Sequence, residues 1–289
     1  MFEGKNVALI LTGGGSRGIA HVGVIAACEE LGIKINTIIG ASAGALIGIF
    51  YGQNKDLEKL KDHFRPTLLR RYKFEQFGWN QMFSLQKFFS AGIVRGIFDL
   101  HYTEKFLART LEVNDFNQLK IPTFVAATNL TDHTGILFGP NSMDHISVSK
   151  ALVASCCIPV LFRPVEIEGK YYVDGEIKRP ISIDTAIETG ADVVIVSDTY
   201  GSILDNIAKA GMLDIATEVV NIMFEDKSMR SVSSSQHKYP DKKIILVSPK
   251  VGNKSVINSY AYDSLIKAGY DATINALQEV RDGIVGNIK

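Results

Sequence analysis

The sequence has no apolar run long enough to cross a lipid bilayer. Its first apolar run, residues 7–11, is followed by Thr12 and three glycines, whereas a membrane-spanning helix needs about 18 apolar residues in succession. The same segment lacks the small-residue cleavage site of a secretion signal. These absences predict a cytoplasmic protein without a transmembrane helix or signal peptide, peripheral to membranes at most.

Net charge and a cysteine framework are absent as well. The 31 Lys and Arg residues balance the 31 Asp and Glu residues, so the broad basic surface of a nucleic-acid-binding protein is not expected. The three cysteines, Cys28, Cys156 and Cys157, lack CxxC spacing, which argues against a disulfide framework or a zinc site. Hydrophobic residues make up 46% of the 289 residues, enough for a core that needs neither.

Short apolar runs alternate with longer runs of helical periodicity along the chain. The pattern predicts strands at residues 7–11, 37–39 and 122–127, helices at 19–31, 42–51 and 147–155, and a hairpin at 165–173; residues 181–189, 193–196, 244–247 and a final helix near 260–281 complete it. Because near-continuous apolar strands are buried on both faces, the pattern predicts a mostly parallel sheet between two layers of helices.

Residues 64–95 interrupt this alternation. Aromatic side chains are interleaved there with Lys and Arg, and Glu75 is the only acidic residue. The aromatic residues could pack a small subdomain while the basic head groups reach water. Alternatively, the segment could form a lipid-facing lid, because interfacial elements combine aromatic and basic side chains. We expect a cap or lid insertion at about residues 64–100 in either case.

The most informative motif is G-x-S-x-G at residues 40–44, with Gly40 and Gly44 on either side of Ser42. It lies between a short apolar strand and a small-residue helix, which is the setting of a nucleophile elbow. The flanking glycines leave room for the tight turn, and the start of a helix favours developing negative charge. The alternative is that Ser42 only caps the helix.

A second glycine-rich motif, residues 13–18, follows the first strand and opens the first helix. Its free amides can hold a phosphate or an oxyanion. A dinucleotide site is not favoured, because the next strand ends in Gly40-Ala41-Ser42 rather than in the ribose-binding carboxylate. A Walker lysine is also missing, since Arg17-Gly18-Ile19 stands in its place. The oxyanion use is therefore preferred.

A base must activate Ser42, because a serine hydroxyl is a weak nucleophile at neutral pH. His237 comes late enough in the chain to complete a Ser, Asp, His order and stands in a serine-rich stretch that suggests a mobile loop. Asp174 ends a β run and is followed by Gly175, although an Asp-Gly pair is also a common turn. His21 is expected to pack within its helix. The remaining histidines are expected to be solvated or hydrogen-bonded: His63, His101, His133 and His145.

The glycine-rich loop with Arg17, the elbow around Ser42 and the later Asp174-Gly175 pair, in this order, resemble the patatin-like phospholipases. Residues 18–24 and 154–162 add to the resemblance, which spans roughly the first 180 residues. It implies a three-layer α/β/α fold and a Ser-Asp dyad without a catalytic histidine.

In that dyad Ser42 would be the nucleophile and Asp174 the base, acting through its position, because the reference pKa of Asp is only about 3.9. The family's oxyanion hole maps onto these loop residues: Gly13, Gly14, Gly15, Arg17 and Gly18. Glu176 departs from the family, which usually has a small residue after Asp-Gly. A second carboxylate could raise the pKa of Asp174 or disfavour anionic headgroups.

We therefore expect a single α/β domain over residues 1–289 that cleaves lipid esters, as a phospholipase A or a carboxylesterase, with no metal or organic cofactor. The expected partners are a lipid or acyl-ester substrate and, transiently, a membrane surface, but no nucleic acid; the oligomeric state is left open. Three alternatives stay open: a histidine-dependent α/β-hydrolase esterase using His237, a catalytically silent lipid-binding or regulatory protein, and an acyl transferase.

Overall fold

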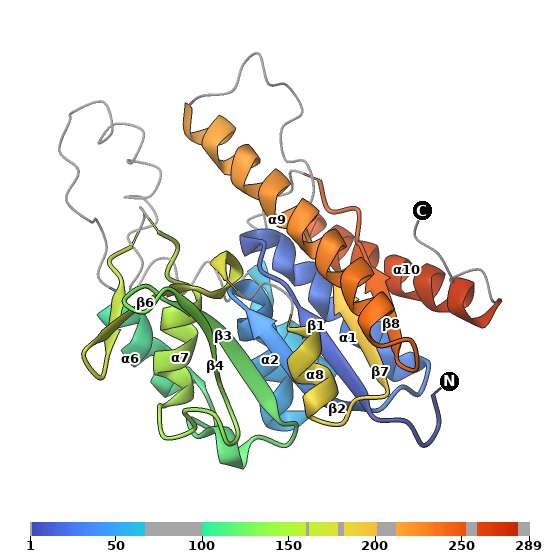
Figure 1. Cartoon of the computed structure of the whole chain (residues 1–289), viewed down its shortest axis with the longest axis horizontal. Helices are drawn as coiled ribbons and strands as arrows, with labels where there is room; N and C mark the ends of the chain where they lie inside the picture. The colour runs from blue at the N-terminus through green and yellow to red at the C-terminus, as the bar shows by residue number, and fades with distance from the viewer. Residues whose placement is uncertain are drawn as a thin grey trace.

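A central sheet of eight strands organises the protein (Figure 1). The computed structural model describes residues 2–66, 100–159, 162–178, 182–200, 212–252 and 259–282. The strands are β1 (Val7–Leu11), β2 (Ile35–Ala41), β3 (Thr123–Asn129), β4 (Thr134–Phe138), β5 (Val165–Ile167), β6 (Lys170–Asp174), β7 (Val193–Ser197) and β8 (Lys243–Val247). Their order is β5-β6-β3-β2-β1-β7-β8, and β4 pairs with β3.

Helices connect these strands and cover the sheet. The α-helices are α1 (Ala20–Glu30), α2 (Ala43–Asn54), α3 (Leu57–Phe64), α6 (His101–Thr110), α7 (Val148–Ser155), α8 (Ile183–Glu188), α9 (Met212–Lys238) and α10 (Ser259–Arg281). Short 3-10 turns are η1 (Gly15–Ile19), η2 (Phe116–Gln118) and η3 (Gly175–Ile177). None of these described helices is long and apolar enough to cross a membrane.

The two faces of the sheet carry separate hydrophobic cores, as alternation along each strand requires. Leu9 and Leu11 of β1 face the core shared with α1, α2, α7 and α10. Ala8 and Ile10 of the same strand face the core shared with α8 and α9. The sheet therefore lies between two helical layers, and the predicted three-layer α/β/α fold is confirmed.

The parallel part of the sheet consists of β3, β2, β1, β7 and β8. Its strands are buried along nearly their whole length, which agrees with their apolar sequences. The predicted hairpin is formed by β5 and β6. Glu168 and Gly169 turn it with φ of 51° and 75°, the left-handed values that a two-residue hairpin turn requires.

Two strand ends meet on one edge of β3, and this junction positions the site. Ala41, the last residue of β2, pairs with Ala126 of β3, and Asp174, the last residue of β6, pairs with Ala127. Residues 125–129 of β3 pair with β4 on the opposite edge. Strands β2 and β6 therefore lie along the same edge of β3, run toward each other and end opposite neighbouring residues of β3.

Two expectations about individual segments need comment. His237 does not lie in a loop, because the serine-rich stretch around it belongs to α9, so that prediction was wrong. The aromatic and basic segment predicted as a cap or lid falls mostly on residues 67–99, which lie outside the described residues. Its role stays a prediction.

Candidate active site

Ser42 occupies a strained turn between β2 and α2. Its backbone has φ 51° and ψ −121°, a conformation that costs a non-glycine residue about 1–3 kcal/mol and that is concentrated at functional sites. The side chain makes no capping hydrogen bond to the helix, so the interpretation of Ser42 as an ordinary helix cap was wrong. The strand, sharp turn and helix have the geometry expected of a nucleophile elbow.

Close backbone contacts explain the two glycines of the elbow. A Cβ on Gly40 would lie 2.6 Å from the Cα of Ala45, and a Cβ on Gly44 would overlap the backbone carbonyls at the end of β1. Side chains at these positions would push α2 away from the sheet. The glycines therefore set the depth at which Ser42 sits, 8% exposed.

Two side chains at the end of α7, those of Ser155 and Cys156, form hydrogen bonds with Ser42. The Ser42 N–H donates a 2.9 Å hydrogen bond to Oγ of the fully buried Ser155. The Cys156 thiol is hydrogen-bonded to the Ser42 side chain, and burial raises the pKa of that thiol. Neither residue was identified as part of the site from the sequence, in which both stand in a stretch noted only for its family resemblance. We attribute to them the orientation of the elbow.

Asp174 lies next to Ser42 because β2 and β6 end on neighbouring residues of β3. Its backbone is fixed on both sides: its N–H donates to the Cys157 carbonyl at 2.9 Å, and its carbonyl accepts from Thr128 Oγ1 at 2.9 Å. The carboxyl group accepts hydrogen bonds from the Glu176 N–H, at 3.0 Å, and from the Ser42 side chain. The structure thus brings together the predicted nucleophile and base.

Burial raises the pKa of Asp174 to about 6, and the hydrogen bonds from Glu176 and Ser42 only partly offset this effect. The charged form is disfavoured because the carboxyl group has little contact with water. From the sequence, Asp174 is expected to have the ordinary pKa of an aspartate, and Glu176 is the group that could raise this pKa. Burial is the cause, and Asp174 is a stronger base than that reasoning assumed.

Gly175 lets the chain turn away after this carboxylate. A Cβ at position 175 would overlap the backbone carbonyl of Ala126 on β3. The Asp-Gly pair therefore does form a turn, and the turn serves to hold Asp174 against β3.

The glycine-rich loop lies at the end of β1 and leads into η1. Gly14 and Gly15 have φ of 130° and 58°, values that glycine adopts without strain. Within the described part of the chain, the N–H groups of these two residues have no hydrogen-bond partner. A Cβ on Gly18 would lie 2.6 Å from Cβ of Ala43, so the loop packs directly against the elbow.

Two of the other predicted donors of the loop, Gly13 and Arg17, are engaged within the protein. The Gly13 N–H donates to a carboxyl oxygen of Glu176, and the Arg17 N–H donates to the Gly14 carbonyl at 3.1 Å. The Arg17 guanidinium is buried and lies 5.8 Å from the ring centre of Tyr200. The amides of Gly13 and Arg17 are therefore not available to a substrate, and those of Gly14 and Gly15 are the candidate oxyanion donors.

No histidine among the described side chains hydrogen-bonds to Ser42 or Asp174. The ring of His21 is buried between Ser197 Oγ and the Thr12 carbonyl, both at 2.8 Å, and burial lowers its pKa to about 4. His237 is exposed, and its ring Nδ1 is hydrogen-bonded to the Ser233 carbonyl of the same helix, α9, at 2.8 Å. It lies just before β8 begins, whereas Ser42 follows the end of β2, and β2 and β8 belong to the same parallel part of the sheet, so the two residues lie at opposite ends of the parallel strands.

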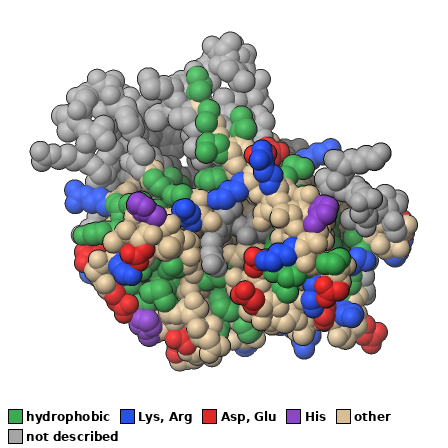
Figure 2. Space-filling model, in the orientation of Figure 1, with side chains coloured by type: hydrophobic (Ala, Val, Ile, Leu, Met, Phe, Trp, Pro, Cys, Tyr) green, Lys and Arg blue, Asp and Glu red, His purple; other side chains and the backbone are tan. Residues whose placement is uncertain are grey.

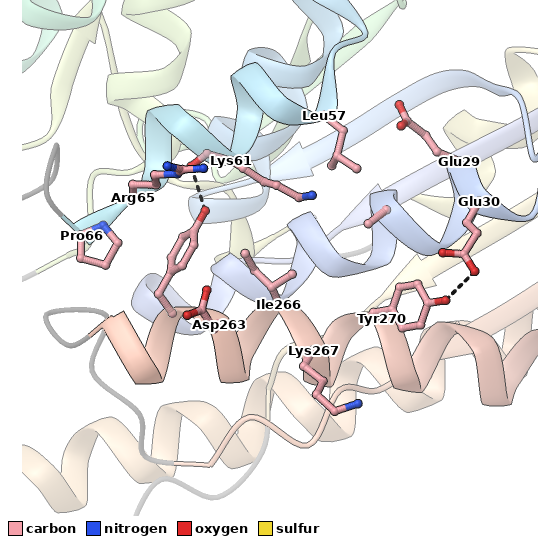
Figure 3. A pocket seen from close by; sticks show the side chains of 12 residues that line it. Glu29, Glu30, Leu57, Lys61, Arg65, Pro66, Asp263, Ile266, Lys267 and Tyr270 are labelled. Atoms are coloured by element: carbon pink, nitrogen blue, oxygen red, sulfur yellow. Dashed lines mark hydrogen bonds between the residues drawn. The ribbon is translucent and has the colours of Figure 1, made fainter.

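A groove of about 1030 Å³ lies away from this site, between α1, α3 and α10 (Figure 3). Both tyrosines that line it already have partners: Tyr270 donates to Glu30 and Tyr262 donates to the Lys61 carbonyl, both at 2.8 Å. Neither Ser42 nor Asp174 lines it. The strained serine and perturbed carboxylate, rather than this volume, identify the candidate active site.

The patatin-like phospholipase family model matches residues 9–187 of the chain. A lysophospholipase of Neurospora crassa is 31% identical over 207 residues, which cover 72% of this chain and 13% of the fungal protein. An uncharacterized NTE family protein of Mycobacterium bovis is 29% identical over 231 residues, covering 79% of this chain and 57% of that protein. The chain thus spans a small part of the fungal relative and little more than half of the mycobacterial one.

Among solved structures, the fold is similar to that of VipD from Legionella pneumophila. The TM-score is 0.51 at 17% sequence identity, with 95% of this chain and 67% of that chain covered. At this identity the likeness concerns the fold alone.

Proposed function

The chain belongs to the patatin-like phospholipase family, and from that premise we propose that it is a serine acyl hydrolase that cleaves ester bonds of lipids. The observation that carries the proposal is the junction on β3, where a strained Ser42 meets the buried carboxylate of Asp174. The amides of Gly14 and Gly15, which have no hydrogen-bond partner among the described residues, follow the end of the neighbouring strand β1.

In the proposed first half-reaction, Ser42 Oγ attacks the acyl carbonyl carbon while its proton passes to Asp174. The negative charge that develops on the carbonyl oxygen is held by the amides of Gly14 and Gly15, which are already oriented and cost no reorganisation. The C–O bond to the leaving alcohol or lysolipid then breaks, and Asp174 returns the proton to the leaving oxygen.

In the second half-reaction, water attacks the acyl-enzyme and Asp174 takes its proton. The tetrahedral species collapses to release the fatty acid, and the proton returns to Ser42 Oγ. A base with a pKa of about 6 is mostly ionised near neutral pH and still accepts a proton transiently. The chain's own side chains and amides supply each of these roles.

Exposed apolar side chains around this edge of the sheet support a lipid substrate. Lys227 of α9 donates to the Ile177 carbonyl at 2.7 Å, and Phe224 contacts the ring of Tyr200 with centroids 5.3 Å apart. From there the first part of α9 projects beyond the body of the protein (Figure 1). Figure 2 shows hydrophobic side chains along this projection. Among the described side chains in the first two-thirds of α9, five are exposed and apolar: Ile215, Val219, Ile222, Met223 and Met229.

Two more exposed apolar residues flank the candidate site itself. Ile158 follows the Cys156-Cys157 pair and is 42% exposed, and Ile177 follows Asp174-Gly175-Glu176 and is 36% exposed. Apolar side chains exposed together mark binding surfaces for lipids or partners more often than isolated ones do. We propose that the protein meets its substrate at a lipid surface and binds that surface transiently.

Hydrolysis assays on matched variants test the proposal. Wild type, Ser42→Ala, Asp174→Asn and His237→Ala would be compared on chromogenic acyl esters of increasing chain length and on phospholipid vesicles, with circular dichroism to confirm folding. The proposal predicts that the first two variants lose activity and that His237→Ala keeps it. Vesicle binding without hydrolysis by any folded form would instead support a lipid-binding protein. An acylated product formed from an acceptor other than water would instead support an acyl transferase.

A further inference from the structure

Glu176 is a buried carboxylic acid that the proposed cycle does not use. It lies in η3, two residues after Asp174, and is only 2% exposed. Its backbone N–H donates to Asp174 Oδ1 at 3.0 Å, while its side-chain Oε1 accepts the N–H of Gly13. One residue therefore joins the base to the glycine-rich loop, although β6 and β1 are not neighbouring strands.

The surroundings of Glu176 are unfavourable for a negative charge. Burial raises the pKa of Glu176 well above its ordinary value, and the carboxyl groups of Asp174 and Asp198 raise it further, while the Gly13 amide and the Tyr200 hydroxyl act in the opposite direction. Its second oxygen, Oε2, is buried and has no hydrogen-bond partner among the described residues. An ionised carboxylate with one unpaired buried oxygen would be costly.

The charged groups that face Glu176 come from three further elements. Asp198 follows β7 and accepts from the Tyr200 N–H at 3.0 Å. Lys227 of α9 lies close enough to Glu176 for the glutamate charge to counteract the lowering of the lysine pKa by burial. The Lys227 ammonium donates a hydrogen bond to the Ile177 carbonyl. Arg17 of the loop lies over the Tyr200 ring. The two cations thus have contacts of their own beside this carboxyl group.

We propose that Glu176 is a positioning residue that acts in its neutral form and clamps Gly13 to the strand end carrying Asp174. With the first amide of the loop held in this way, the chain turns so that Gly14 and Gly15 present theirs to the substrate. The clamp fixes the distance between the base and the oxyanion donors, so that the loop and the end of β6 keep the same relative position. This inference rests on the proposed hydrolase function.

Substitutions at position 176 separate the clamp from a merely structural role. Glu176→Ala removes the acceptor for the Gly13 N–H and is expected to lower kcat about 10- to 100-fold, with KM changed less than about threefold, because misplaced catalytic groups cost rate at this scale. Glu176→Gln keeps an acceptor oxygen and no charge, so it is expected to restore kcat to within about threefold of wild type. Glu166→Ala, at an exposed glutamate of β5, is the matched control.

The pH profile of kcat/KM gives the readout that a structural role would not move. If Glu176 is neutral, Glu176→Gln leaves the acid limb of the profile where it is in wild type. An ionised Glu176 would be raising the pKa of its neighbour Asp174, so its removal would shift the limb downward by more than about half a pH unit. That shift, or an unchanged kcat in folded Glu176→Ala, would overturn the proposal.

A second measurement does not depend on activity. In wild type labelled with ¹³C at the glutamate carboxyl carbon, the resonance that is missing from Glu176→Gln belongs to position 176. The proposal predicts the chemical shift of a protonated carboxyl at about pH 7, whereas a resonance that titrates near the ordinary glutamate value of about 4.3 overturns it. If Ser42→Ala equals wild type in every ester assay, the hydrolase function fails while this resonance still decides the state of Glu176.

Discussion

Replacing Asp174 with asparagine should inactivate the protein and, at the same time, make it more stable in mild base. Burial raises the pKa of Asp174 from 3.8 to about 6. A carboxyl group whose pKa is higher in the folded state than in the unfolded state contributes stability below its unfolded pKa and loses it as pH rises through its folded pKa. The window of that loss is therefore about pH 4 to pH 6.

The size of the effect follows from the pKa difference of about two units between the folded and unfolded states. At about 1.4 kcal/mol per unit, keeping Asp174 ionised costs the folded protein about 3 kcal/mol above pH 6. Asparagine occupies the same volume without the charge, so Asp174→Asn should raise the free energy of unfolding by about 2–3 kcal/mol near pH 8 and by much less near pH 4. Urea unfolding of both proteins at the two pH values measures this difference.

The same carboxylate sets the acid limb of the activity of the wild type. Because Asp174 must be ionised to accept the Ser42 proton, kcat/KM should be half-maximal near pH 6 and should fall about tenfold for each unit below it. An acid limb near pH 4, together with equal stability of wild type and Asp174→Asn near pH 8, would refute the argument that burial tunes this base.

Three further predictions concern the elbow and His237. Ser155→Ala leaves the buried Ser42 N–H without its acceptor and should cost about 1–3 kcal/mol of unfolding free energy and lower kcat, whereas Ser234→Ala, at an exposed site, should do neither. Gly44→Ala forces a methyl group against the backbone of β1 and should destabilise the fold by about 1–3 kcal/mol or more in urea unfolding. His237→Ala should keep kcat and change stability by no more than about 0.5 kcal/mol, because the side chain is exposed; a large loss of rate would reopen the histidine-dependent mechanism.

The parts of the fold that could be predicted from sequence are those with a strong local signal. Strand β1 was predicted with its observed bounds because its five consecutive apolar residues are followed by Thr12 and three glycines. The elbow was recognisable because only glycines permit the approach of α2 to β1 and β2. Helix α9 was not predicted at all, and its last part was taken for a loop because the serine-rich stretch has no continuous apolar stripe, although Ser228, Val232 and Ser235 are buried.

Long-range pairing and burial were beyond a local interpretation. The meeting of β2 and β6 depends on which edge of β3 each strand takes, and nothing in either strand's own sequence specifies that. The raised pKa of Asp174 and the contact of Glu176 with Gly13 arise from the same packing. Glu176 was noticed as a departure from the family pattern, but its role as a bridge to the loop required the structure.

Covalent trapping of the nucleophile tests the central claim most directly. A fluorophosphonate with an alkyl chain would be incubated with wild type, Ser42→Ala, Asp174→Asn and His237→Ala, and the modified peptide would be identified by mass spectrometry. The account predicts one adduct, on Ser42, that forms at the same rate in wild type and His237→Ala, forms far more slowly in Asp174→Asn and is absent from Ser42→Ala. An adduct on another residue, or labelling of Ser42 that does not depend on Asp174, would contradict it.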